Sequence, residues 1–346
     1  MTATLLAVDA MSGDLGPRVI VPACLAALRR NPSLEIVLVG NPDSISTLLP
    51  TLPGPLAGRL HIHPASEVVL MDDPPAQMLR GKPDSSMRVT LQLVRDGQVN
   101  GCVSSGNTGA LMALSRHVLK VIPGIDRPAI MTALPARDGP VYLLDLGANV
   151  DTTADQLVQF ALMGSLALEL TGVVQPRVAL LNIGIESIKG SQQVRQAGVL
   201  LEQSDFVCYT GYIEADAVFA NQADVVVCDG FVGNVLLKTV EGVARLMGGQ
   251  MREEAGRTLW RRLLVGLNRG LWHGLARNWS PDRYNGAVLL GVNGLVVKSH
   301  GAAGERAFLA ALEQAVQIAG EDLPSRLAQR FGQLPEVLRQ TPGCDS

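Results

Sequence analysis

Six short aliphatic runs in this chain each end in a turn of glycine and polar residues. The runs are continuous rather than alternating, which indicates strands buried on both faces of a sheet. Helical stretches separate them, and that alternation predicts βαβ units and a mostly parallel sheet. Such sheets bind ligands at the carboxyl ends of their strands, so we expect the polar turns to share one edge. The runs cover residues 5–8, 35–39, 101–104, 141–144, 177–181 and 225–227.

The 346 residues suffice for one large core. Without a tandem repeat or a low-complexity linker, we predict a single α/β domain over 1–320. We expect a helical hairpin inserted at about 245–280 and a polar, partly loose tail at 321–346. The net charge of −3 gives no electrostatic case for nucleic acid. No apolar run approaches the ~20 residues of a membrane span, and no signal peptide begins the chain. The five scattered cysteines are typical of reduced cytoplasmic thiols.

The stretch at 223–242 combines a strand, a glycine-rich turn and a segment, 235–239, that suits a buried helix. This order places backbone N–H groups where an anion or a developing oxyanion binds. The amide of Asn234 adds a donor; the alternative is that Asn234 only caps the helix. Lys238, one turn further, faces either the same pocket or solvent. The other candidate binding residues of this turn are Asp229, Gly230 and Gly233.

A second turn, at 104–109, is built from small residues with hydroxyl and amide groups. Small residues let the backbone approach a ligand, and donors converge on the predicted helix start, which suits a phosphate. The pattern is neither a Walker loop nor G-x-G-x-x-G, and an ordinary N-cap is the alternative. The candidate phosphate ligands are Ser104, Ser105, Gly106, Asn107 and Thr108.

Lys189 lies between a predicted strand end and a helix. Its ammonium can donate a charged hydrogen bond to phosphate or to a carbonyl oxygen, with Glu186 to orient it. The alternative is a solvated surface Glu/Lys pair. His300 is the best site candidate among five dispersed histidines. The sequence has no zinc pattern and no G-x-S-x-G elbow, so we predict no metal, no cofactor and no activated nucleophile. A bound phosphate can be the nucleophile instead.

Residues 251–279 contain all three tryptophans, with leucine every four residues and several arginines. Leucine and tryptophan on one side and arginine on the other describe an interfacial helix pair. The alternative is a protruding hairpin packed in a dimer interface or over the active site. Both interpretations are correct if the base of the hairpin packs against protein and its tip touches lipid. The candidate membrane or partner contacts are Leu259, Trp260, Arg261, Arg262, Leu263, Leu267 and Leu271.

At these motifs the chain resembles the bacterial phosphate acyltransferase family, the acyl-carrier-protein:phosphate transacylases of phospholipid synthesis. It departs from the family at Ser12, where a second glycine is usual, and at 211–215, where GYIEA replaces GNVEG. Neither change removes Lys189 or Asn234. The matching stretches are AVDAMSGDLGP at 7–17, ASEVVLMDDPP at 65–75, KPDSSM at 82–87, VSSGNTGALMA at 103–113, GIDRPAI at 124–130, LLDLGANVD at 143–151, LLNIGIESIKG at 180–190, VVVCDGFVGNVLLKTVEG at 225–242 and GLVVKSHG at 294–301.

The resemblance implies a homodimer with a three-layer α/β/α sandwich, similar to phosphotransacetylases and to isocitrate-dehydrogenase-like folds. It implies transfer of a long-chain acyl group from acyl carrier protein to inorganic phosphate, without nicotinamide, metal or covalent intermediate. The acyl phosphate would pass to a membrane glycerol-3-phosphate acyltransferase. We expect a cytoplasmic protein, peripherally associated with the inner face of the cell membrane.

Our mechanistic hypothesis is direct attack of phosphate on the thioester. Phosphate would bind among the 104–108 backbone, Lys189 and His300, while Asn234 and the N–H groups of the 230–234 turn hold the oxyanion. One alternative is a coenzyme A-dependent phosphotransacetylase. The other is a non-catalytic scaffold that binds carrier protein. The sequence does not decide which of Lys189, Lys238 and Lys298 lies nearest the phosphate.

Overall fold

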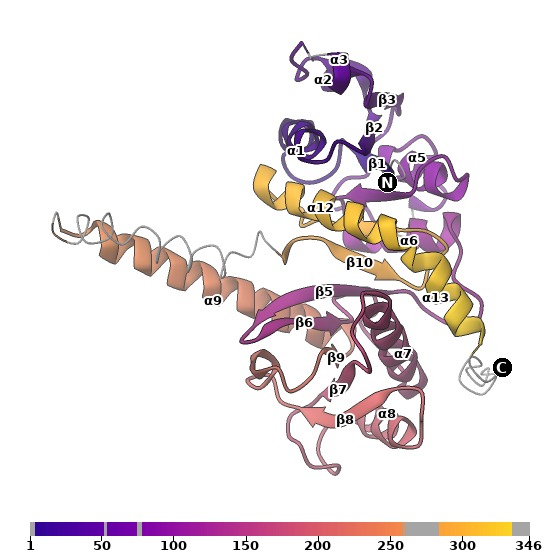
Figure 1. The fold of residues 1–346 in the computed structure, drawn as a ribbon, viewed down its shortest axis with the longest axis vertical. Coiled ribbons are helices and arrows are strands. Elements are labelled where there is room, and N and C mark those ends of the chain that lie inside the picture. The colour runs from indigo at the N-terminus through magenta and orange to yellow at the C-terminus, as the bar shows by residue number, and fades with distance from the viewer. Residues whose placement is uncertain (1–3, 52–53, 75–77, 259, 261–283, 334–346) are drawn as a thin grey trace.

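One sheet of 11 strands runs through the computed structural model, which describes residues 4–51, 54–74, 78–258, 260 and 284–333 (Figure 1). In chain order its strands are β1 (Thr4–Asp9), β2 (Leu34–Gly40), β3 (Leu60–Pro64), β4 (Gly101–Ser104), β5 (Ala129–Ala136), β6 (Gly139–Leu144), β7 (Arg177–Leu181), β8 (Cys208–Ile213), β9 (Val225–Val227), β10 (Ala287–Leu290) and β11 (Val296–Lys298). Across the sheet the order is β3-β2-β1-β4-β11-β10-β5-β6-β9-β7-β8. All six aliphatic runs of the sequence form strands, which confirms the α/β fold.

The sheet is mostly parallel, but its centre is not. The three neighbouring pairs β11–β10, β10–β5 and β5–β6 are antiparallel, whereas β4 runs parallel to β11 and β9 runs parallel to β6. Three reversals leave β4 and β9 pointing in opposite directions. The turns after Ser104 and after Val227 therefore start at opposite edges, and our expectation of a single shared edge is wrong.

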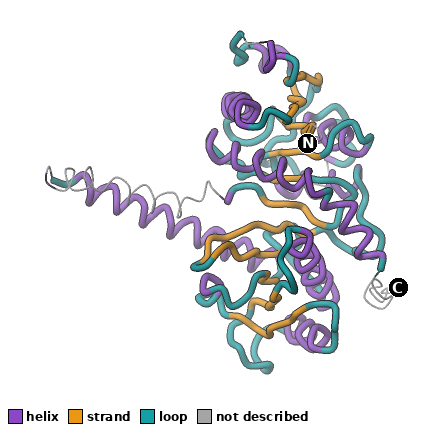
Figure 2. Tube along the Cα trace, in the orientation of Figure 1, coloured by secondary structure: helices purple, strands orange, loops and turns teal. Residues whose placement is uncertain are grey.

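Helices cover both faces of the sheet, which makes three layers (Figure 2). One apolar cluster joins the sheet to α1 (Pro17–Arg30), α7 (Ala154–Leu170), α8 (Gln192–Glu202), α12 (Glu305–Glu321) and α13 (Leu323–Gly332). The other joins it to α5 (Ser86–Arg95) and α6 (Thr108–Val118). Alternate strand residues serve the two clusters, as a strand buried on both faces requires. The described elements also include two short helices, α2 (Pro42–Ser46) and α3 (Gly54–Ala57), and a 3-10 turn, η1 (Val218–Ala220).

The C-terminal segment packs more closely than the sequence indicates. Residues 323–332 form α13 rather than a loose polar tail, and Leu323, Leu327 and Phe331 are buried in the cluster that also holds α7. Their i, i+4, i+8 spacing gives α13 one apolar stripe among polar residues. That stripe lies within a segment whose overall composition is polar, so composition conceals it.

Helix α9 (Gly230–Gly256) is the longest described helix, at 27 residues. At 1.5 Å per residue it spans about 40 Å, and Figure 1 shows it projecting away from the sheet. Only Gly230 and Gly233 of this helix are buried, so our expectation of a buried helix at 235–239 is wrong. Leu236 and Leu237 are partly buried against the cluster that includes α5 and α6, while the other residues of this stretch are exposed. In the described part of the chain, no helix is long and apolar enough to cross a membrane.

Candidate active site

The turn after β4 is fixed to the loop after β1 by serine hydroxyls. Ser104 Oγ donates to Asp9 Oδ2 at 2.7 Å, and the backbone N–H of Ser105 donates to Ser12 Oγ at 3.0 Å. Asp9 is buried, and burial raises the pKa of its carboxyl group. Ser12, the departure from the family pattern, therefore holds the candidate phosphate turn in place.

The loop after β11 closes the same turn from the other side. The backbone N–H of Ser299 donates to Ser104 O at 2.9 Å, and that of Asp14 donates to Gly301 O at 2.9 Å. A Cβ on Gly13, whose φ is 76°, would lie 2.6 Å from Ser105 Oγ. Glycine is required there because the three segments meet at backbone distance. The structure thus brings the 104–108 turn and the loop that carries His300 together.

Asn107 caps α6, as the alternative interpretation expected. Its side chain accepts from the Ala110 N–H at 3.0 Å and donates to Met71 O at 2.6 Å. The Gly106 N–H donates to Ser104 Oγ at 3.2 Å, and Thr108 begins the helix. Capping and ligand binding are compatible here, because an Ncap side chain satisfies only part of the first turn.

The start of α9 shows that Asn234 is not a cap. Asp229 is the N-cap residue, and its Oδ1 accepts from the Val232 N–H at 2.8 Å. The Gly230 N–H donates to Asn149 O at 2.7 Å, and the Gly233 N–H donates to Asp229 O at 3.0 Å. Three N–H groups that we expected to face an oxyanion are thus used within the protein. Asn234 lies beyond this first turn, with its residue exposed, so its side chain is the available donor.

Gly230 and Gly233 allow α9 to approach the loop after β6. A Cβ on Gly233 would lie 1.9 Å from Asp145 O, and one on Gly230 would lie 2.6 Å from Asn149 O. Gly147 of the same loop would bring a Cβ within 3.6 Å of the Asn234 Cβ. The two glycines of the turn therefore serve close packing, and that packing positions Asn234.

Asp145 anchors this loop, and although it lies within the LLDLGANVD stretch, the sequence pattern does not single it out. Its Oδ1 accepts from the N–H groups of Ile130 and Leu146 at 2.8 and 2.6 Å. Its Oδ2 accepts from the backbone and side chain of Asn149 at 2.7 and 3.0 Å. Burial raises the pKa of this carboxyl, and those donors oppose the rise. The arrangement gives Asp145 a structural role.

Lys189 forms an ion pair with Glu186, Nζ to Oε2, at 2.9 Å. The hydrogen bond between them lowers the pKa of the carboxyl and raises that of the amine. About half of each side chain is exposed, 47% and 53%. Their loop follows β7, which neighbours β9 in the sheet, so Lys189 and Asn234 belong to adjacent strand ends. In the described residues no hydrogen bond or ion pair joins Lys189 to the 104–108 turn.

Lys238 links the two edges of the sheet. Its Nζ lies 2.7 Å from Nε2 of His300 and 3.0 Å from Oε2 of Glu241. Asn234, Lys238 and Glu241 are spaced i, i+4 and i+7, so they share one face of α9. That face starts beside Gly147 and ends beside His300. The sequence did not decide whether Lys238 faces the pocket or solvent, because the contact of α9 with His300 depends on the strand reversals in the sheet.

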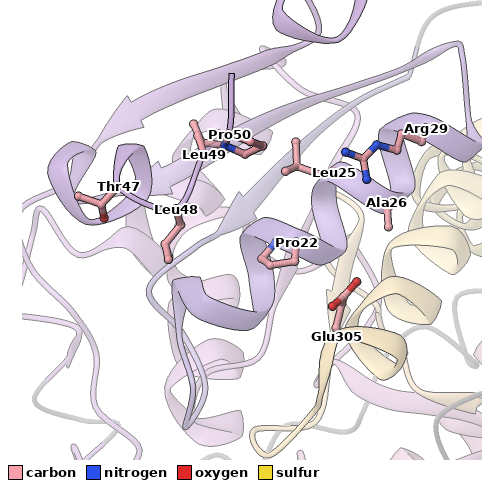
Figure 3. Close-up of a pocket in the computed structure, with 9 residues that line it drawn as sticks. All are labelled: Pro22, Leu25, Ala26, Arg29, Thr47, Leu48, Leu49, Pro50 and Glu305. Atoms are coloured by element: carbon pink, nitrogen blue, oxygen red, sulfur yellow. The ribbon is translucent and has the colours of Figure 1, made fainter. Parts of the chain in front are cut away.

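A pocket of about 480 Å³ lies elsewhere, between α1, the segment after α2 and the start of α12 (Figure 3). It is lined by apolar residues together with Arg29, Thr47 and Glu305. None of the site residues predicted from the sequence lines it, so it is not the candidate active site. The described residues also contain no group of three or more side chains suited to holding a metal ion.

The predicted membrane hairpin is mostly outside the described residues. Leu259, Arg261, Arg262, Leu263, Leu267 and Leu271 all fall there. Trp260 is described, and 77% of its surface is exposed. The role of this segment stays a prediction.

Comparison with known proteins decides the family. The model of a family described as "Fatty acid synthesis protein" matches residues 4–326. A phosphate acyltransferase of Stutzerimonas stutzeri is 52% identical over 345 residues, covering 100% of this chain and 97% of that protein. The chain belongs to this family. A second member, the phosphate acyltransferase of Pseudomonas aeruginosa, is 52% identical over 334 residues, with 96% and 99% covered.

Solved structures of low sequence identity share the fold of this chain. A EutD phosphotransacetylase from Staphylococcus aureus superposes with a TM-score of 0.57 at 14% identity, covering 94% of this chain and 95% of that one. A phosphotransacetylase from Streptococcus pyogenes gives a TM-score of 0.57 at 18% identity, with 91% and 94% covered. These likenesses confirm the expected fold class of the family.

Proposed function

We propose that this member of the phosphate acyltransferase family transfers a long-chain fatty acyl group from acyl carrier protein to inorganic phosphate, yielding an acyl phosphate. One observation carries the proposal beyond family membership. A single face of α9 presents the exposed Asn234 amide and, one turn later, Lys238 in contact with His300. The Cβ atoms of Asn234 and Lys238 thus lie about 6 Å apart, a separation that suits an amide on the thioester carbonyl and an ammonium on the attacking phosphate.

The reaction needs no covalent intermediate. A phosphate oxygen bonds to the thioester carbonyl carbon, the carbon–sulfur bond breaks, and its electron pair leaves with sulfur. The proton lost by HPO4²⁻ ends on the carrier thiol, so R–CO–S–carrier plus HPO4²⁻ gives R–CO–OPO3²⁻ plus HS–carrier. The Asn234 amide donates to the carbonyl oxygen as negative charge develops on it. Ser104, Ser105 and the start of α6 border the phosphate.

Lys189 keeps its proposed catalytic role. Its ammonium, oriented by Glu186 at 2.9 Å, belongs to the strand end next to that of Asn234. From there it neutralises charge on the reacting groups, with a charged hydrogen bond stronger than a neutral one. About half of its side chain is exposed, which leaves it free to meet a substrate.

The surface around these residues favours a long acyl chain. Ile183, Ile185 and Ile188, on the loop that leads to Lys189, are 77%, 69% and 81% exposed. Phe231 and Val235, at the start of α9, are 61% and 50% exposed. Clustered exposed apolar side chains mark ligand or partner contacts. They support a fatty acyl substrate over the short chains of the coenzyme A-dependent alternative.

The proposal extends to the membrane. The projecting α9 leads into the basic, tryptophan-bearing segment at 251–279. We propose that its arginines meet the acidic carrier protein and that its leucines enter the inner surface of the cell membrane. A cytoplasmic homodimer held there would deliver acyl phosphate to a membrane glycerol-3-phosphate acyltransferase. In liposome co-sedimentation, Leu263→Glu with Leu267→Glu should abolish binding; unchanged binding would count against lipid contact.

The test of function is phosphate-dependent release of free carrier from palmitoyl carrier protein, with the acyl phosphate trapped by hydroxylamine. Palmitoyl and acetyl coenzyme A are assayed beside it. Release that requires phosphate, with the carrier thioester preferred, supports the proposal. Preference for acetyl coenzyme A would favour a phosphotransacetylase, and carrier binding without any turnover would favour a scaffold.

A further inference from the structure

The neighbours of His300 fix both its position and its tautomer. Its backbone N–H donates to Asn285 Oδ1 at 2.9 Å, and the Ala302 N–H donates to His300 Nδ1 at 3.1 Å. A backbone N–H can only donate, so Nδ1 is the unprotonated acceptor. Burial, and then the charge of Lys238, lower the pKa of the imidazole, which favours the neutral ring. A neutral ring with Nδ1 unprotonated carries its proton on Nε2.

That Nε2–H faces another donor. The ammonium of Lys238 lies 2.7 Å from Nε2, and an ammonium has no acceptor. The Oε2 atom of Glu241 accepts from Lys238 at 3.0 Å, but it lies 3.9 Å from Nε2 of His300. Two donors in contact repel each other, and of the two only Lys238 has an acceptor, Glu241, among the described residues. An anionic oxygen beside the pair would accept from the Nε2–H and offset the charge of Lys238.

Lys298 adds a third cationic group. It is the last residue of β11 and is partly buried, and its Nζ donates to Ser299 O. Burial, followed by the charge of Lys238, lowers its pKa to about 8, while Asp14 opposes the shift. Lys298 pairs with Ser104 in the parallel β11–β4 register and precedes His300 by two residues, so it belongs to the strand end that carries both the phosphate turn and His300. Lysines and a histidine donor at one strand end are groups that bind an oxyanion.

We propose that Lys238, Lys298 and the Nε2–H of His300 together hold the inorganic phosphate, so that Lys238 is a binding residue for the attacking substrate. This inference rests on the proposed function and names the ligands of its phosphate. The three groups come from α9, β11 and the loop after β11. Phosphate held there lies one helical turn from Asn234 on the same face of α9. The bound phosphate would also contact both α9 and the loop after β11, which start from opposite edges of the sheet.

The test combines phosphate kinetics with histidine NMR on the full-length protein. Lys238→Gln should raise KM for phosphate about 10–100-fold, the loss expected for one charged hydrogen bond, and leave KM for palmitoyl carrier protein unchanged. The matched control is Lys120→Gln, at an exposed lysine in the loop after α6, which should change neither value. In 15N-histidine spectra, assigned through His300→Gln, inorganic phosphate alone should shift the His300 signal in the wild type and not in Lys238→Gln.

Two results separate this inference from the proposed function. Acyl phosphate formation with an unchanged phosphate KM in Lys238→Gln, and a His300 signal that phosphate leaves in place, would overturn the inference while the function stands. A wild type that forms no acyl phosphate, yet whose His300 signal shifts with phosphate through Lys238, would refute the function and keep the anion site. A raised KM for the carrier thioester alone would assign Lys238 to carrier binding and overturn the inference.

Discussion

Lys238 and His300 lie 2.7 Å apart, Nζ to Nε2, although the strands before their segments end at opposite edges of the sheet. The contact exists because α9 starts at the end of β9 and runs past the antiparallel centre of the sheet to the loop after β11. Because α9 takes this course, the site contains residues from both edges of the sheet. The oxyanion donor belongs to one edge, and the phosphate turn belongs to the other.

Asn234→Ala should lower kcat by about 10²–10³, the loss typical of one oxyanion donor. Because Asn234 is exposed and does not cap α9, the free energy of unfolding should change by less than about 0.5 kcal/mol. The matched control is Asp229→Ala, which removes the actual cap and should cost about 1 kcal/mol of stability. Urea denaturation and steady-state assays separate the two effects. If Asn234→Ala kept full turnover and lost as much stability as Asp229→Ala, Asn234 would not be the oxyanion donor.

Gly233→Ala should destabilise the protein by about 1–3 kcal/mol, the usual cost of overpacking. The added Cβ would lie 1.9 Å from Asp145 O, where only backbone movement can relieve the clash. Gly242→Ala, on the same helix with nothing within 4 Å of its Cβ, should instead stabilise by about 0.5–1 kcal/mol. Equal effects of the two substitutions on the urea midpoint would show that α9 does not pack against this loop as described.

The kcat/KM for phosphate should fall as pH rises through about 8, because Lys298 loses its charge there. This ratio reports the free enzyme. Lys298→Arg should move the alkaline limb upward, and Lys298→Gln should remove it together with much of the phosphate affinity. An unchanged limb in both variants would assign it elsewhere. The charged and titratable groups that face Lys298 and His300 are Asp14, Lys238, Glu241 and Arg245.

Lys298 also affects stability, but its contribution to stability rises with pH whereas the kcat/KM for phosphate falls. Its pKa is lowered from 10.5 to about 8 in the folded protein, so between these values the unfolded chain binds more protons at this residue. Its contribution to the free energy of unfolding therefore rises with pH across that window. Activity and stability should diverge above pH 8, and Lys298→Gln should remove this part of the stability profile.

Ile185→Ser with Ile188→Ser should lower kcat/KM for palmitoyl carrier protein by about tenfold and spare a short-chain thioester. Both side chains are largely exposed, and losing their contact with an alkyl chain costs about 0.8 kcal/mol per buried methylene. Val174→Ser, at an equally exposed valine at the other end of β7, is the control. An unchanged chain-length preference with a shift in oligomeric mass would make this patch a subunit contact instead.

The sequence predicts local structure well where one short segment decides it. The run at 225–227 becomes β9 and the apolar stretch at 154–171 becomes the buried α7, because continuous burial leaves a local pattern. The pairing of Lys189 with Glu186 is also local, because a turn in which the Lys189 N–H donates to Glu186 O brings the two residues together. Each of these features depends on residues close in the chain.

What the sequence could not show depends on distant pairings. The short β10 and β11 gave no pattern of their own, yet with β5 they reverse the sheet and separate Ser104 from Asn234. The contact of Lys238 with His300 spans 62 residues. The glycines of the α9 turn looked like ligand-binding residues, but they accommodate the backbone of Asp145 and Asn149. Only tertiary packing distinguishes these two uses of glycine.

In the proposed mechanism, phosphate attacks the thioester directly, across the face of α9 that carries Asn234 and Lys238. The most direct measurement incubates palmitoyl carrier protein and the enzyme with isotopically labelled free carrier, first without phosphate and then with it. Direct attack predicts no label in the palmitoyl carrier protein until phosphate is added, and acyl phosphate formation from that moment. Exchange of label without phosphate would reveal an acyl-enzyme intermediate and contradict the account.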